Sequence, residues 1–221
     1  MGKKLILSLF LVLGLVGMAM AEGTKPVQLS LFNPVQMVPE AESIGGVSLG
    51  LLYTVNQDVT GFSLTLGVNR AKGNVNGVAW GLGNWVDGLF YGWQDGLVSR
   101  TGGRFVGYQE GIVTITQGDF TGLQLGAVNW VDGFTHGAQL GIFNYTVSRF
   151  VGAQLGVVNV VKGDFSGASL GVVNYVEGTA KGLQLGLVNY AKSLNGLQIG
   201  LANYNGNKKP MEFMVIANWS F

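Results

Sequence analysis

Two acidic side chains are the residues of this chain best suited to do chemistry. Asp95 and Glu110 hold the same place in successive copies of a repeat of about fifteen residues, where other copies carry Leu, Ile or Trp. Trp80, Trp93 and Tyr108 occupy the same stretch. Carboxylates beside aromatic rings would suit a binding patch or an oligomer contact. The same residues could instead mark a local break where a sheet bends or meets water, and both interpretations stay open.

No other set of residues points to catalysis, a metal or a cofactor. The chain has no cysteine, which excludes thiol catalysis and cysteine metal sites. Its one histidine, His136, lies beside an expected turn, where it makes neither a metal site nor a Ser-His-Asp set. The Gly-x-Gly run at 81–83 comes from the repeat, since a dinucleotide-binding turn needs a strand followed by a helix. We expect no enzyme.

The composition narrows the class of protein. The 221 residues include 37 glycines but only four prolines, which argues against collagen and against a disordered Pro/Gly-rich chain. Charged residues make up 11% and the formal net charge is +1, so a nucleic-acid partner is not expected. The glycines must therefore serve an ordered backbone.

Both ends of the chain suggest export. Lys3 and Lys4 precede an apolar run and the segment Ala19-Met20-Ala21, a pattern typical of a signal peptide over 1–21, cleaved after Ala21. The remainder, 22–221, is predicted to form a single repeat-built β domain. The alternating apolar segment that ends at Phe221 resembles the assembly signal of outer-membrane β-barrels.

A fifteen-residue repeat accounts for most of the chain. Each copy reads approximately G-x-Q-L-G-x-V-N-Y-V-x-G-x-F-x, and its places are numbered from the first glycine. Copies start at residues 46, 61, 77, 92, 107, 122, 137, 152, 167, 182 and 196, with weaker copies at 26–34 and 211–221. Leucine-like and Gly/Gln residues alternate within a copy, as they do in a strand. Pairs such as Asp132-Gly133 fit turns. The sequence predicts an all-β protein.

Two architectures can use this repeat. The first is an antiparallel outer-membrane-type β-barrel of about 12–14 strands, which we take as the main expectation because the repeat is nearly a palindrome and the leucine face could meet lipid. The alternative is a β-solenoid with one repeat per coil, which stacks Asn, Gln and Gly on themselves and explains the constant period. A barrel also needs a stagger between strands that identical turns do not give.

The repeat resembles that of bacterial leptospiral-type surface repeat proteins. The likeness is carried by 182–190 (GLQLGLVNY) and 196–204 (GLQIGLANY), and by the entry 27–35 and exit 216–221. The resemblance implies a location in the cell envelope and no established enzymatic activity, and it supplies no catalytic residues. Some members are lipoproteins, and the lack of cysteine excludes such an acyl anchor here.

The functional expectation follows the architecture. A barrel would be an integral protein of the outer membrane or cell surface with a structural or narrow-pore role, and its partners would be lipid and the barrel-assembly machinery. A solenoid would be a soluble periplasmic or surface module for binding or self-association. Its exposed valine and aromatic columns would then form the interaction stripe.

Overall fold

The chain forms strands and turns throughout its described part. The computed structural model describes residues 23–221, so the predicted signal peptide lies outside the described residues. No helix occurs between residues 23 and 221, and the all-β prediction is confirmed. The chain divides into two compact units, the first ending at Thr101 and the second spanning Gly102–Phe221. The expectation of one domain over 22–221 stays a prediction.

Each unit is a series of strands joined by turns. The first unit contains β1 (Lys25–Phe32), β2 (Val35–Gln36), β3 (Ile44–Asn56), β4 (Val59–Ala71), β5 (Val75–Val86), β6 (Phe90–Asp95) and β7 (Val98–Thr101). The second contains β8 (Phe105–Thr116), β9 (Phe120–Val131), β10 (Thr135–Leu140), β11 (Phe143–Thr146), β12 (Phe150–Leu155), β13 (Val158–Val161), β14 (Phe165–Leu170), β15 (Val173–Leu185), β16 (Val188–Asn205) and β17 (Phe213–Ser220).

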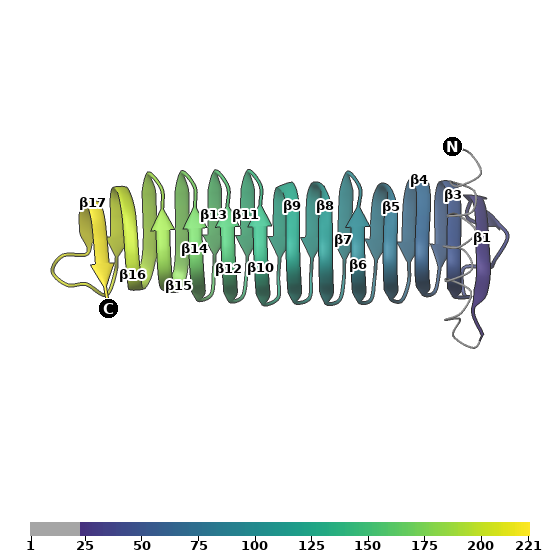
Figure 1. Ribbon diagram of the computed structural model, residues 1–221, viewed down its shortest axis with the longest axis horizontal. Coiled ribbons are helices and arrows are strands. Elements are labelled where there is room, and N and C mark those ends of the chain that lie inside the picture. Colours follow the sequence, from purple (N-terminus) through teal and green to yellow (C-terminus); the bar gives the residue numbers. More distant parts are fainter. Residues whose placement is uncertain (1–22) are drawn as a thin grey trace, which may run out of the picture. The chain divides into compact units, whose positions relative to one another are not determined.

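One repeat makes one coil. In the coil that begins at Gly137, the strand β10 leads to a corner at 141–142, then to β11 and a turn at 147–149. The next coil repeats this path with β12 and β13. β10 pairs with β12 in parallel, so that Gly137 lies beside Gly152 and Gln139 beside Gln154. Figure 1 shows coils stacked in this way, and each unit is a β-solenoid.

The expected antiparallel barrel is wrong, and the alternative, a β-solenoid, is confirmed. The Asp132-Gly133 pair is not a hairpin tip, because the strands that follow it pair in parallel with residues one repeat earlier, as Thr135 does with Phe120. Asn129 likewise lies beside Asn144. The physical reason is the constant period: stacking with no offset uses it directly, whereas a barrel needs a stagger.

The amide face of the repeat is the interior of the coil. The third, eighth, tenth and fourteenth places point inward, so glutamine, asparagine, Val or Thr, and Phe are buried. Phenylalanines stack where they are neighbours, with ring centroids 5.2 Å apart for Phe105 and Phe120 and 5.7 Å apart for Phe150 and Phe165. Such a coil is too thin for a large apolar core, and stacked polar side chains fill the rest.

Buried asparagines form a continuous ladder. Asn144 Nδ2 donates to Asn159 Oδ1 at 2.8 Å, and Asn159 Nδ2 donates to Asn174 Oδ1 at 2.9 Å. The second hydrogen of each amide binds the backbone, as when Asn159 Nδ2 donates to the carbonyl of Leu170 at 2.9 Å. The buried amides are thus satisfied by neighbouring coils, which removes the cost of burying them.

Buried glutamines form a second ladder in the opposite direction. Gln139 Nε2 donates to Gln124 Oε1 at 2.7 Å, and Gln154 Nε2 donates to Gln139 Oε1 at 2.8 Å. Ser169 holds this place in the following coil, and its Oγ donates to Asn174 Oδ1 at 2.6 Å instead. The glutamine ladder is therefore interrupted between Gln154 and Gln184.

We expect Ser169→Gln to stabilise the protein. The introduced amide can accept from Gln184 and donate to Gln154, and two new buried hydrogen bonds minus the one lost from Ser169 are worth about 1 kcal/mol. Urea unfolding of the second unit should show a higher midpoint with an unchanged slope. A lower midpoint would mean that the gap has no room for the longer side chain.

Glycine at the first place of the repeat is required by the stacking. These glycines adopt positive φ, for example 136° at Gly152, which disfavours any residue with a Cβ. A Cβ on Gly152 would also meet the carbonyl oxygen of Gly137 in the preceding coil. This column of glycines therefore lets neighbouring coils approach at strand spacing.

The two weaker copies of the repeat behave differently. β1 pairs with β3 in parallel, with Val27 beside Val47 and Gln28 beside Ser48, so the first copy continues the stacking. Gln28 is buried like other glutamines of its place and donates to the carbonyl of Val38 at 2.9 Å.

The segment 211–221, expected to be a weaker copy of the repeat, does not stack as a further parallel coil. β17 pairs with β16 in antiparallel orientation, which sets Asn218 beside Gln198. The segment has Met211 and Val215 where the repeat has glycine, and a parallel coil with these residues would clash with its neighbour. The chain therefore reverses and the last strand covers the final coil.

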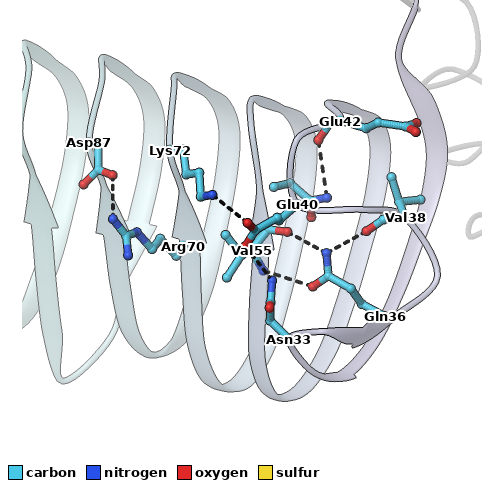
Figure 2. A network of polar contacts seen from close by, with 10 residues as sticks. Asn33, Gln36, Val38, Glu40, Glu42, Val55, Arg70, Lys72 and Asp87 are labelled. Carbon is cyan, nitrogen blue, oxygen red and sulfur yellow. Dashed lines mark hydrogen bonds and ion pairs between the residues drawn. The ribbon is translucent and has the colours of Figure 1, made fainter.

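The first coils are covered by the loop that precedes β3. Gln36 Nε2 donates to the carbonyls of Val38 and Val55 at 2.6 and 2.8 Å, and both valines are buried. Figure 2 shows Glu40 of this loop paired with Lys72, at 3.0 Å between Oε1 and Nζ. The hydrogen bond with Lys72 is the largest influence that lowers the pKa of Glu40. The loop is therefore fastened to the coils by polar contacts.

Candidate interaction surface

The residues of the predicted patch lie on the outer face of the coils. In the first unit, Trp80 is paired with Asp95 and Val78 with Trp93 on neighbouring strands. The two tryptophans are about half exposed, at 53% for Trp80 and 46% for Trp93. The first unit thus brings an acid and two exposed indoles together on one face.

The other two residues of the patch lie in the second unit. Tyr108 Oη donates to Glu110 Oε2 at 2.6 Å, so this carboxylate has a polar partner on its own strand, β8. Asp95 and Glu110 belong to different compact units, and their union in one binding patch stays a prediction.

A larger surface is formed by the corner that joins the two strands of each coil in the second unit. We define the apolar edge as the outward residues at the fourth, sixth and seventh places of five coils, within 125–128, 140–143, 155–158, 170–173 and 185–188. All of these side chains are aliphatic or phenyl. At the sixth place, Ile142 is 60% exposed, Val157 47% and Leu187 51%. The edge is thus an exposed apolar row that recurs coil after coil.

Charge is confined to the other corner of the coil. Between residues 111 and 207, every Asp, Glu, Lys and Arg holds the eleventh, thirteenth or fifteenth place, and four are acidic and four basic. We call the corner that carries them the charged edge. Some of its carboxylates accept hydrogen bonds from the backbone of the turn in the next coil. Asp119 Oδ1 accepts from Phe134 N, and Asp164 Oδ1 accepts from Thr179 N, both at 2.8 Å. The coil is therefore amphipathic from one corner to the other.

A column of aromatic residues, interrupted by Val160, separates the two edges on the shorter strand. Trp130 and Tyr145 stack with centroids 4.2 Å apart, and Tyr190 stacks on Tyr175 at 4.6 Å and on Tyr204 at 5.1 Å. The indole Nε1 of Trp130 donates toward the charged edge, to Asp132 Oδ1 at 2.7 Å. The rings thus lie between aliphatic and charged residues.

We expect Tyr190 to make the stability of the protein sensitive to alkaline pH. Burial, followed by the neighbouring tyrosines, raises the pKa of Tyr190 above its ordinary value. Unfolded tyrosine ionises near pH 10. The contribution of Tyr190 is therefore complete below that pH and is lost as pH rises through the folded pKa. Tyr190→Phe should reduce the fall in urea midpoint between about pH 9 and pH 11. An equally steep fall of the midpoint with pH in the variant would contradict this prediction.

Backbone polar groups at the apolar edge are bonded between coils. Gly141 N donates to the carbonyl of Leu155 at 2.9 Å, and Gly156 N donates to that of Leu170 at 3.0 Å. Val158 N donates to Ile142 O at 2.9 Å on the other side of the corner. The leucine carbonyls also accept from the asparagine ladder. The edge thus presents side chains, while its peptide groups are satisfied within the protein.

Within residues 23–221, no three His, Asp or Glu side chains are grouped as metal ligands. The same residues include no helix long and apolar enough to span a membrane. No protein-family model, curated protein or solved structure matches the chain.

The repeat pattern in the sequence predicted only part of the outer surface of the solenoid. For a solenoid it expected valine and aromatic columns outside, and residues of both kinds are exposed or half-exposed in the second unit, such as Val188 and Tyr145. It did not add the leucine column to that surface, although Leu155 is exposed. The signal that could have shown this is the restriction of charge to three places of the repeat.

Proposed function

We propose that this protein is an interaction module of the cell envelope that binds through its apolar edge. The single observation that carries the proposal is the separation of apolar and charged residues to opposite corners of the coil. An apolar surface that is continuous over several coils is unusual on a monomeric soluble protein and generally marks an interaction site. The signal-peptide pattern and the resemblance to surface repeat proteins support export.

A structural cause for the exposed residues is the weaker explanation. The fold is held by the inward Asn, Gln, Val and Phe columns and by parallel pairing, which involve none of the outward side chains at the sixth place. Polar residues at the sixth place would preserve those contacts. A row of Ile, Val and Leu at this corner therefore favours a binding role.

Site-specific photo-crosslinking in intact producing cells tests the proposal. A photo-crosslinking amino acid replaces Val157 on the apolar edge or, as a matched control, the exposed Val147 of the charged edge. We expect adducts from position 157 and few or none from position 147. Equal labelling at the two positions, or none at either, would refute an interaction through the apolar edge.

A further inference from the structure

We infer that the occupant of the apolar edge is the surface of a lipid bilayer, with the solenoid lying along the membrane and its corner inserted among the headgroups and upper acyl chains. The inference rests on the proposed function and names its partner. The first support is the order of residue types with distance from the corner. Aliphatic or phenyl side chains at the sixth and seventh places are followed by Trp or Tyr at the ninth, except for Val160, and by charges at the eleventh, except for Val147.

This order of residue types matches the layers of a membrane interface, and its extent matches the depth of an interfacial protein. Tyr and Trp prefer the headgroup level, with aliphatic residues below them and charges in water. Three residues of strand from the corner to the ninth place span about 10 Å. The apolar faces of interfacial helices enter a bilayer by roughly 5–10 Å, so the depth of the edge is of the same size.

The corner also meets the condition that hydrocarbon imposes on the backbone. Peptide groups that enter acyl chains need partners inside the protein. Gly141, Gly156 and Val158 donate to neighbouring coils. The side chains of Asn144 and Asn159 donate to the carbonyls of Leu155 and Leu170 from inside. Insertion of the corner would therefore leave these peptide hydrogen bonds intact.

The repetition of the edge favours a fluid partner over a second copy of the chain. Successive coils present nearly the same side chains, as at Leu140, Leu155 and Leu170. A protein docked on such a surface could shift by a whole coil with little change in contact, which gives no unique register. Binding to a lipid surface requires no unique register, so the repetition of the edge does not weaken such binding.

The balance of charge indicates the type of lipid. Because the charged edge between residues 111 and 207 carries equal numbers of acidic and basic side chains, it provides little net attraction to anionic headgroups. Binding should therefore occur on vesicles of phosphatidylcholine alone and should persist at high salt, when long-range electrostatic attraction is screened.

Flotation of the full-length protein with phosphatidylcholine vesicles tests the inference. We expect the protein to float, and we expect the triple variant Ile142→Gln, Val157→Gln, Val172→Gln to lower the partition coefficient by at least about tenfold. Val147→Gln on the charged edge should float like the unaltered protein. Equal urea midpoints for the three proteins, measured separately, establish that the variants fold.

A label reports which corner enters the lipid. Because the chain has no cysteine, Val157→Cys or Val147→Cys can each carry one environment-sensitive fluorophore. Vesicles should shift the emission to the blue at position 157 only. Crosslinks confined to position 157, together with no flotation and a dimer mass in sedimentation, would overturn the lipid inference in favour of a second copy while the proposed function stands. Absence of both crosslinks and flotation would overturn both.

Discussion

Asn159→Asp should destabilise the second unit by at least about 4 kcal/mol at pH 7, because a buried carboxylate cannot replace the amide that it removes. Asn159 Nδ2 donates to the carbonyl of Leu170 and to Asn174 Oδ1, each at 2.9 Å. A carboxylate would set oxygen against these two acceptors in a dehydrated coil. Chemical unfolding at pH 7, followed by circular dichroism, measures the loss.

The pH dependence of that variant distinguishes charge from packing. Burial and the two facing oxygens should raise the pKa of the introduced carboxyl above its unfolded value of about 3.9. Folding of the variant is then least penalised while this carboxyl is protonated, and the penalty grows as pH rises and the carboxyl ionises. The loss of stability should therefore be smaller near pH 4 than at pH 7. Asn195→Asp, at an exposed place, should change stability by less than about 0.5 kcal/mol. A defect independent of pH would argue against a buried charge.

Gly152→Ala should be among the most damaging single-methyl changes in the second unit, with a loss of about 3 kcal/mol or more. Its φ of 136° is unfavourable for alanine, and the new Cβ would press on the carbonyl of Gly137. Because both residues belong to a hydrogen-bonded pair of strands, the coil cannot move away without loss of pairing. Thermal and urea unfolding would report the change.

Gly83→Ala is the matched control for the glycine prediction. The Cβ there would meet the side chain of Val68 and no backbone atom, with the nearest methyl at 3.1 Å, and the φ of Gly83 is not in the positive range. The expected change in the free energy of unfolding is about 1 kcal/mol or less in either direction. Similar losses for the two variants would show that the first-place glycines are not needed for close stacking.

The sequence was sufficient for the class of fold because its period is short and regular. Alternation within each copy predicted strands with two distinct faces, and the face that carries glutamines such as Gln154 is the buried one. The direction of pairing was harder to predict. A nearly palindromic copy looks similar whether its neighbour is parallel or reversed, so Asn129 could be matched with either His136 or Asn144. Only the absence of stagger separates the two.

Some features of the candidate site were likewise visible in the sequence, and others depended on the fold. The phase of the charges, with Lys162 and Glu177 at the eleventh place and none at the fourth through seventh places of those coils, was visible in the sequence. Which outward column is exposed depends on how the coil bends at residues such as Gly156, and this is a property of the three-dimensional path. The reversal of β17 had a signal in Met211 and Val215, which replace glycines of the repeat, although Asn218 fits the repeat as well as asparagines that stack in parallel.

The stacking of like on like has a consequence for how such a protein can change over generations. Gly137 contacts Gly152, and Asn144 contacts Asn159, through interactions that recur one coil further along. Removal or duplication of fifteen consecutive codons therefore joins surfaces that already match, whereas a change that is far from a whole number of repeats leaves a coil at the junction that cannot match both of its neighbours. Recombination between copies can thus lengthen or shorten the molecule in whole steps, and the length of the apolar edge can be selected without redesign of the interior.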